Sequence, residues 1–185
     1  IGTSRNGDDG STKILSQWAK KYSYSGKLTT VDIDSRNCDL VRSWNLDNVE
    51  IVNKSGEEYL KNDFPHHTDY INFLYLDNFD WDWHPEKPED FVRDQQERYT
   101  ELGYTMTNIN SQRAHLAQAI QAVRGLADIS LVVCDDTWYN KWWGHYSGKS
   151  GSVVPYLMNH GFEVIYTEEQ PVYGTILGRR LKRLN

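Results

Sequence analysis

Apolar residues along the chain occur in two patterns, helical spacing and short continuous runs. In "STKILSQWAKKY" they recur at helical spacing, with Ser11 or Thr12 placed to cap the first turn and lysines in the last turn, which predicts a helix. The run "KLTTVDID" then predicts a short buried strand, and "SRNCDLVRSWNL" predicts a second helix that begins at a Ser35 cap. The chain therefore starts as an alternation of helix and strand.

The same alternation continues to the end of the chain. Strands are predicted for "VEIVNK", "DYINFLYLDN", "ISLVVCDD", "FEVIYT" and "VYGTILGRR", and helices for "SGEEYLKN", for the stretch from about Ser111 and for "SVVPYLMNHG", which Gly161 closes. The segment after Asp77 is predicted to be a loop, and its part from Pro85 to Thr107 is a candidate lid or subunit contact. This order predicts an α/β fold with a mostly parallel sheet, helices on both faces and an antiparallel final return across "EEQP".

Length, charge and cysteine content narrow the class of protein. The chain has 185 residues, so we expect a single domain over residues 1–185. Its 20 basic and 26 acidic residues give a net charge of -6, which argues against a nucleic acid partner. No run approaches the roughly 20 apolar residues of a membrane span, so no membrane partner is expected. The cysteines form no disulfide framework, and Cys134 lies in an apolar run, which favours a reducing, cytoplasmic location.

The chain opens on a glycine-rich loop, "IGTSRNGDDGST", in front of the first predicted helix. Glycine lets the backbone approach a ligand closely, and the start of the helix offers unpaired N–H groups. The loop has neither the GxGxxG spacing of a dinucleotide site nor the GK[ST] of a P-loop, and it can equally be a surface turn. Because such a loop usually follows a strand, we expect that the first strand of the domain is largely missing at the N-terminus.

Acidic residues follow several predicted strands, where ligands bind in open α/β sheets. Asp32 can accept hydrogen bonds from both hydroxyls of a ribose; alternatively, Asp32 or Asp34 caps the next helix. If "NFLYLD" and "LVVCDD" are neighbouring parallel strands, Asp77, Asp135 and Asp136 meet at one edge. Carboxylates so close repel one another unless a cation or protons intervene, and hard oxygen ligands suit Mg2+, Ca2+ or Mn2+. The alternative is that Asp136 turns the following loop while Asp77 bonds to backbone.

A set of short motifs carries a family resemblance. In order along the chain they are "IGTSRNG", "VDID", "NKSGEEYL", "FLYLDNFDWD", "VVCDDTW" and "GKSGSVVPYLMNHGFEV". Together they resemble the class I S-adenosylmethionine-dependent methyltransferases, and more narrowly the metal-dependent O-methyltransferases that act on sugars and other small molecules. The resemblance implies a Rossmann-like, doubly wound sheet whose C-terminal strand is antiparallel. Two departures from the family pattern are the absence of the acid expected just before Ile1 and the extra residues "NGDDG" in the first loop.

The resemblance implies a role for residues at the strand ends. For the cofactor S-adenosylmethionine, it implies that Gly2, Thr3 and Ser4 line the methionine end, that Asp32 holds the ribose hydroxyls, and that Ser55, Gly56 and Glu57 lie by the adenine. For the metal, it implies that Mg2+ or another divalent cation is bound by Asp77, Asp135 and Asp136.

The expected reaction is methyl transfer to a hydroxyl of a small-molecule acceptor, with the metal lowering the pKa of that hydroxyl. Asp80 and His84 are the candidate bases, and His115 and His145 are weaker ones. Several tryptophans near the same edge either stack on the substrate or pack the loops against the sheet: Trp81, Trp83, Trp138, Trp142 and Trp143. Since motifs of a fold do not fix its chemistry, a metal-dependent hydroxylase-like or hydrolytic enzyme and a non-catalytic cofactor-binding module stay open, and so does a homo-oligomer.

Overall fold

In the computed structural model, the described residues are 10–64, 70–77, 79–80, 89–169 and 174–180. The elements, in chain order, are α1 (Ser11–Lys21), β1 (Leu28–Asp32), α2 (Ser35–Ser43), β2 (Val49–Asn53), α3 (Gly56–Glu58), η1 (Tyr59–Asp63), β3 (Ile71–Leu76), α4 (Glu89–Glu101), α5 (Asn108–Ala122), β4 (Leu126–Cys134), β5 (Thr137–Asn140), β6 (His145–Gly148), α6 (Val153–Met158), β7 (Glu163–Thr167) and β8 (Thr175–Arg180). All the helices and strands that the sequence predicts are among them. None of the described helices is both long and apolar enough to cross a bilayer.

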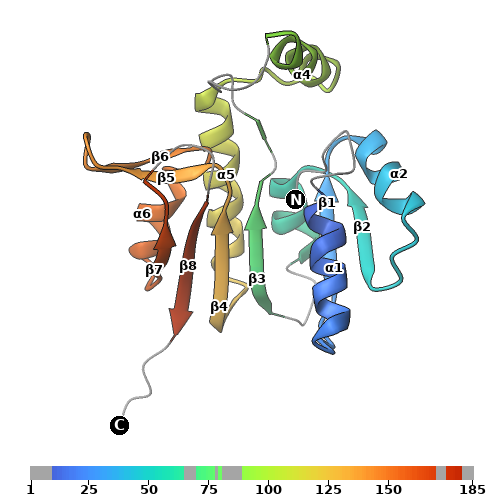
Figure 1. The fold of residues 1–185 in the computed structure, drawn as a ribbon, viewed down its shortest axis with the longest axis horizontal. Coiled ribbons are helices and arrows are strands. Elements are labelled where there is room, and N and C mark those ends of the chain that lie inside the picture. Colours follow the sequence, from blue (N-terminus) through green and yellow to red (C-terminus); the bar gives the residue numbers. More distant parts are fainter. Residues whose placement is uncertain (1–9, 65–69, 78, 81–88, 170–173, 181–185) are drawn as a thin grey trace.

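A four-stranded sheet in the order β3-β4-β8-β7 forms the larger half of the molecule (Figure 1). β3 and β4 are parallel, and the pair Leu76 and Cys134 closes their ladder, so the residues that follow these strands emerge side by side. β8 pairs antiparallel with both β4 and β7. The predicted neighbouring strands and the antiparallel return are therefore confirmed.

β1 and β2 form a separate parallel pair. Within the described residues no ladder joins β1 to β3, so the single doubly wound sheet expected from the sequence is divided into two sheets. Side chains connect the halves instead, because Val31 and Val52 from the smaller sheet pack with Ile71 and Leu74 of β3 against a cluster that contains Ala122 of α5.

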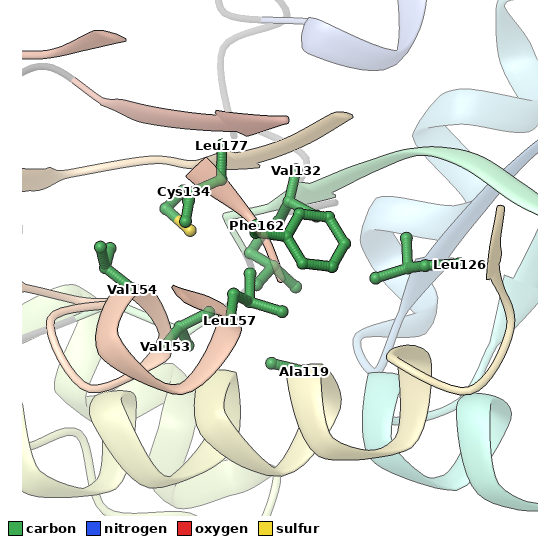
Figure 2. Close-up of a cluster of buried hydrophobic side chains, with 10 residues drawn as sticks. Ala119, Leu126, Val132, Cys134, Val153, Val154, Leu157, Phe162 and Leu177 are labelled. Atoms are coloured by element: carbon green, nitrogen blue, oxygen red, sulfur yellow. The ribbon is translucent and has the colours of Figure 1, made fainter. Parts of the chain in front are cut away.

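The main core lies between the four-stranded sheet and the helices α5 and α6 (Figure 2). Val132, Cys134 and Leu177 point from the strands toward Ala119 and Leu157 on these helices. Burial raises the pKa of the Cys134 thiol to about 12, which keeps it protonated as an apolar core group. The prediction of a small buried thiol at this position is confirmed.

The opposite face of the four-stranded sheet differs from the expectation that helices cover both faces. Its strands carry large apolar side chains that are 40% to 73% exposed: Phe73, Ile129, Leu131 and Ile165. Only the smaller sheet has helices on both of its faces among the described residues. There the buried Thr30 hydroxyl hydrogen-bonds Thr12 of α1 at 3.2 Å, while the next residue, Val31, packs toward η1.

One helix and one hairpin lie outside the predicted set, and both follow strands of the larger sheet. α4 forms within the segment predicted to be a loop, and in Figure 1 it lies beyond the ends of β3 and β4. β5 and β6 form an antiparallel hairpin in which Asn140 pairs with His145, and Gly144 adopts a positive φ of 67° at its tip. The hairpin begins one residue after Asp136, so both elements stand at the edge where the predicted site residues emerge.

Candidate active site at the strand ends

The ammonium group of Lys149 lies among the aspartates that follow β3 and β4. Its Nζ atom is 3.1 Å from Asp77, 3.4 Å from Asp80 and 2.9 Å from Asp136. The Lys149 side chain is only 4% exposed. We call Asp77, Asp80, Asp135 and Asp136 the strand-end acidic cluster. The expectation that three of these carboxylates need a neighbouring cation is met by a lysine of the chain itself.

The position of Lys149 follows from the close approach of the two ends of the β5–β6 hairpin, at Asp136 and Gly148. We call this approach the crossing. Asp136 has a φ of 45° and Gly148 a φ of 95°. A Cβ atom on Gly148 would lie 1.9 Å from the Asp136 carbonyl oxygen, so only glycine fits this crossing. The backbone N–H of Lys149 then donates to the same carbonyl at 3.0 Å. The alternative prediction, that Asp136 turns the following loop, is therefore confirmed for its backbone.

Asp135 behaves differently from its neighbours in the strand-end acidic cluster. Burial raises the pKa of the Asp135 carboxyl above its usual range, and the charge of Asp77 and a hydrogen bond to Asp77 raise it further. A hydrogen bond also joins Asp135 to Tyr75. The pKa of Tyr75 is raised as well, by burial and by the charge of Asp77. The surroundings of Asp135 therefore favour its protonated form, and a shared proton was the second expected way to relieve the repulsion between these carboxylates.

His115 lies directly behind Lys149 and is fully buried on α5. Its Nδ1 atom is 3.1 Å from the Lys149 carbonyl oxygen, so this nitrogen carries the proton and donates. Burial lowers the pKa of His115 to about 4, and the charge of Lys149 contributes to the shift. A neutral histidine with no exposed atoms supports the Lys149 backbone and does not reach a substrate, which removes His115 from the candidate bases.

The strand-end acidic cluster does not fit a divalent cation as it stands. The ammonium of Lys149 occupies the space between Asp77, Asp80 and Asp136 that the metal would need. The raised pKa of Asp135 also disfavours the ionised form that a metal ligand requires. Within the described part of the chain, no three His, Cys, Asp or Glu side chains are grouped so as to hold a metal. The expected Mg2+ site at Asp77, Asp135 and Asp136 is therefore not supported, and Lys149 is the cation found beside Asp77 and Asp136.

Asp32 lies at the end of β1, as predicted. One of its oxygens accepts from the Asp34 backbone N–H at 2.8 Å, and the other accepts from Asn37 at 2.9 Å. A carboxylate has about four acceptor positions, so these bonds orient Asp32 and are compatible with further bonds from a diol. The cap of α2 is Asp34, which accepts from the Arg36 backbone N–H, and not Ser35 as predicted.

Ser55 and Gly56 lie after β2, where the adenine-binding segment is predicted. The Ser55 hydroxyl caps α3 by accepting from the Glu58 backbone N–H at 3.2 Å. Gly56 lies against the amide of Gln118 on α5, and a Cβ atom at Gly56 would be 2.8 Å from that amide. The Nε2 atom of Gln118 is buried and has no hydrogen-bond partner among the described residues. An orphaned donor beside Gly56 is a group that a bound ligand with an acceptor atom would satisfy.

α4 connects the two parts of the site. Arg98 forms an ion pair with Asp34 and donates to the Asn37 side-chain oxygen at 2.6 Å, at the start of α2. On the other side, Gln95 donates to Asp80 at 2.6 Å. Burial raises the pKa of Asp34, but the hydrogen bonds from Arg36 and Arg98 outweigh it and hold the value at about 2.

Phe79 and Asp80, which follow β3, also contact residues of α4 and the segment after it. The backbone N–H of Asp80 donates to the Tyr99 hydroxyl at 2.7 Å, and the ring of Phe79 packs against those of Tyr99 and Tyr104. α4 therefore contacts both the start of α2, next to Asp32, and Asp80 of the strand-end acidic cluster.

The remaining candidates separate into three groups. Glu57 lies in the first turn of α3 and Trp138 is buried at the base of the hairpin. Trp142 and Trp143 are 95% and 75% exposed at the hairpin tip, where Trp143 stacks on the ring of His145. The predicted residues Gly2, Thr3, Ser4, Trp81, Trp83 and His84 lie outside the described residues.

Sequence reasoning missed Lys149, Gln118 and Arg98. A signal for Lys149 does exist, since aspartates that require a cation are followed by a lysine between Gly148 and Ser150 in a glycine-rich segment. Gln118 and Arg98 have no such signal, because a polar residue on a helix is ordinarily solvated and only the tertiary packing brings these two side chains to the strand ends.

Comparison with solved structures shows which proteins share this fold. A "putative methyltransferase" from Streptococcus mutans in complex with SAH aligns with a TM-score of 0.50 and 14% identity, over 94% of this chain and 82% of that one. An rRNA methylase from Streptococcus thermophilus gives 0.51 and 12%, over 95% and 82%. A "putative rRNA-methylase" from Clostridium thermocellum gives 0.50 and 11%, over 94% and 82%. No protein-family model matches the chain, and no curated protein does either.

These similarities establish the fold, which is the Rossmann-like α/β fold of S-adenosylmethionine-dependent methyltransferases. They give no support to the narrower resemblance to metal-dependent small-molecule enzymes. They also overturn one prediction: the net charge of -6 suggests that nucleic acid is not a partner, yet chains of this fold include an rRNA methylase. Net charge is therefore no ground for excluding nucleic acid.

Proposed function

We propose that the chain transfers a methyl group from S-adenosylmethionine to a hydroxyl oxygen of an acceptor. The observation that supports the proposal is the link that α4 makes in this fold between two strand ends. Arg98 contacts Asn37, which donates to Asp32, and Gln95 donates to Asp80 of the strand-end acidic cluster. The carboxyl ends of parallel strands are where open α/β sheets bind their ligands.

Two groups of residues would hold the cofactor. Asp32 would accept hydrogen bonds from the ribose hydroxyls, and the buried Nε2 of Gln118, which has no partner in the described part of the chain, would donate to the adenine side near Gly56. When bound, S-adenosylmethionine supplies an electrophilic methyl group on a sulfonium. The acidic surroundings are compatible with that positive charge.

Asp80 is the residue that we assign as the base. Its side chain is 26% exposed, which leaves it accessible to an acceptor, and Gln95 and Lys149 fix its two oxygens. In this role Asp80 takes the hydroxyl proton as the oxygen forms its bond to the methyl group. The protein otherwise contributes orientation, which for a transfer in line with the leaving sulfur is a large part of the rate.

The charges around the site restrict how an acceptor can lie in it, and they do not exclude RNA. Asp77, Asp80 and Asp136 together carry more negative charge than Lys149 offsets, so a phosphate near them would be repelled. An RNA acceptor would have to bring its base into the site while keeping its phosphates away, so RNA is one of the acceptors to be tested.

Calorimetry with S-adenosylhomocysteine tests the cofactor part of the proposal. We expect binding that the Asp32→Ala variant weakens at least tenfold, while the control Asp39→Ala, an exposed aspartate on α2 paired with Arg42, binds as the wild type does. Radiolabelled methyl transfer to a panel of small-molecule alcohols and RNA tests the reaction. Binding without product from any acceptor would favour the non-catalytic alternative, and absence of binding would refute the proposal.

A further inference from the structure

Lys149 differs from an ordinary buried lysine in the number of carboxylates around it. Its ammonium contacts Asp77 from the end of β3, Asp80 from the loop after it and Asp136 from the end of β4, all within 3.4 Å. These residues come from separate segments, so the position of each depends on the shared cation. Three donors on an ammonium and three carboxylates around it form a matched set.

We propose that Lys149 does the work of a divalent cation in this protein: its ammonium holds Asp77, Asp80 and Asp136 together, so that the strand-end acidic cluster is assembled without metal. The carboxylates that a metal-binding site would use are present, and the cation between them is covalently attached to the chain. The part of this proposal that concerns positioning of Asp80 for the acceptor rests on the proposed function; the part that concerns assembly does not.

Several contacts fix the backbone of Lys149 in one position. The Gly148 crossing admits no side chain, the Lys149 N–H bonds to the Asp136 carbonyl, and its own carbonyl accepts from the buried His115. The backbone of Lys149 is therefore held at both its N–H and its C=O. A lysine held this way has its amine directed into the cluster by the fold, and it has no exposed alternative position.

The geometry also indicates what would follow if the amine were removed. Three carboxylates would surround a space whose centre lies 2.9 to 3.4 Å from their oxygens. Calcium binds oxygen at about 2.3–2.6 Å and accepts irregular coordination completed by water. Inward movement of each carboxylate by about 1 Å or less would therefore create a calcium site.

Thermal unfolding with added ions tests the proposal on the whole chain. The wild type, stripped with EDTA, is expected to keep its Tm within about 1 °C when millimolar Ca2+ or Mg2+ is added, because the ammonium already fills the site. Lys149→Met is expected to lower the Tm by about 10 °C, since the carboxylates lose their buried partner. Calcium should restore at least half of this loss in the variant. Lys141→Met, at the exposed hairpin tip, is the matched control, and neither its Tm nor its response to Ca2+ should differ from those of the wild type.

A second variant covers the case in which Lys149→Met does not fold without ions. Lys149→Met with Asp136→Asn removes one carboxylate charge together with the ammonium and should regain part of the stability. A wild type that loses stability in EDTA or gains several degrees in Ca2+ would overturn the proposal. So would a Lys149→Met variant that keeps the wild-type Tm, or one that neither Ca2+ nor Asp136→Asn improves. None of these readouts depends on methyl transfer, so they separate this proposal from the proposed function.

Discussion

Gly148 and Asp136 cross so closely that a Cβ atom on Gly148 would lie 1.9 Å from the Asp136 carbonyl oxygen. This contact joins the two ends of the β5–β6 hairpin and sets the direction of the residue that follows Gly148. The approach of the two backbones is therefore a condition for the position of Lys149 as well as for the hairpin.

Gly148→Ala should therefore lower the free energy of unfolding by more than an ordinary Gly→Ala change at a positive φ. A methyl group cannot fit at this distance from a backbone atom, and the φ of 95° is unfavourable for alanine, so we expect a loss of roughly 3 kcal/mol or more in the free energy of unfolding. Gly144→Ala is the control, because its φ of 67° is also positive but its Cβ would meet nothing nearer than 4.0 Å. That variant should lose about 1 kcal/mol. Urea unfolding of both variants measures the difference, and equal losses would contradict the role given to the crossing.

Arg98→Ala should detach α4 from the start of α2. Arg98 and Asp34 form a largely buried ion pair, so its removal is expected to cost about 2 kcal/mol and to speed amide exchange along α4. Arg93→Ala, an exposed arginine on the same helix, should leave the exchange unchanged. If α4 keeps its protection in Arg98→Ala, the helix is held by its other contacts, which include the Arg36–Glu101 ion pair and the Gln95–Asp80 hydrogen bond.

The same ion pair predicts a pH dependence. The folded-state pKa of Asp34 is lowered to about 2, so its contribution to stability is present above the ordinary pKa of about 4 and is lost as the pH falls from there toward 2. Arg98→Ala should show a shallower loss over this range, because Arg36 alone then holds the carboxylate. Tm measured at intervals between pH 2 and pH 5 checks the slope, and parallel curves for variant and wild type would contradict it.

Asp135→Asn should have the opposite pH signature. Because the folded state raises the pKa of Asp135, its proton stabilises the fold at pH values below about 4, and that stability is lost as the pH rises. Asparagine keeps a donor toward Asp77 and does not titrate, so the variant should gain on the wild type by up to about 1.4 kcal/mol per pH unit above that range. Asp128→Asn, an exposed change on the same strand, is the control. A stability difference independent of pH would show that Asp135 is ionised in the folded protein.

Gly56→Ala tests the cofactor segment through Gln118. The new methyl group would lie 2.8 Å from the Gln118 amide and push it from its place, so we expect weaker S-adenosylhomocysteine binding by about tenfold in calorimetry. Gly56→Ala combined with Gln118→Ala removes the clash but also the donor. If the donor binds the ligand, the double variant should regain stability without regaining affinity; recovery of both would mean that only the clash mattered.

The strand order at the site could be predicted because it depends on local pattern. "NFLYLD" and "LVVCDD" are apolar runs with acids at their ends, and their parallel pairing follows from the crossover helix between them, so Asp77 and Asp135 were placed together correctly. The identity of the cation could not be predicted in this way. Lys149 reaches the aspartates through a hairpin whose two strands, "TWYN" and "HYSG", are only four residues long, which is too short for a clear alternating pattern.

α4 shows a different limit of the sequence pattern. The helix is largely polar and lies after a proline-containing stretch, so it has no apolar stripe from which to predict it. Besides the packing of Tyr99 against Phe79, its contacts are ion pairs and single side-chain hydrogen bonds to α2 and to Asp80. Interactions of this kind depend on the final arrangement of distant segments, and for that reason neither the helix nor Arg98 could be inferred beforehand.

The division of the sheet between β1 and β3 has a consequence for how a ligand would act on the molecule. Asp32 belongs to one half and the strand-end acidic cluster to the other, and no described backbone ladder crosses between them. A ligand that contacts both would therefore serve as a mechanical tie, replacing the missing ladder by bonds through itself. Its binding should slow amide exchange in β1 and β3 together, so that two halves which open separately become one cooperative unit.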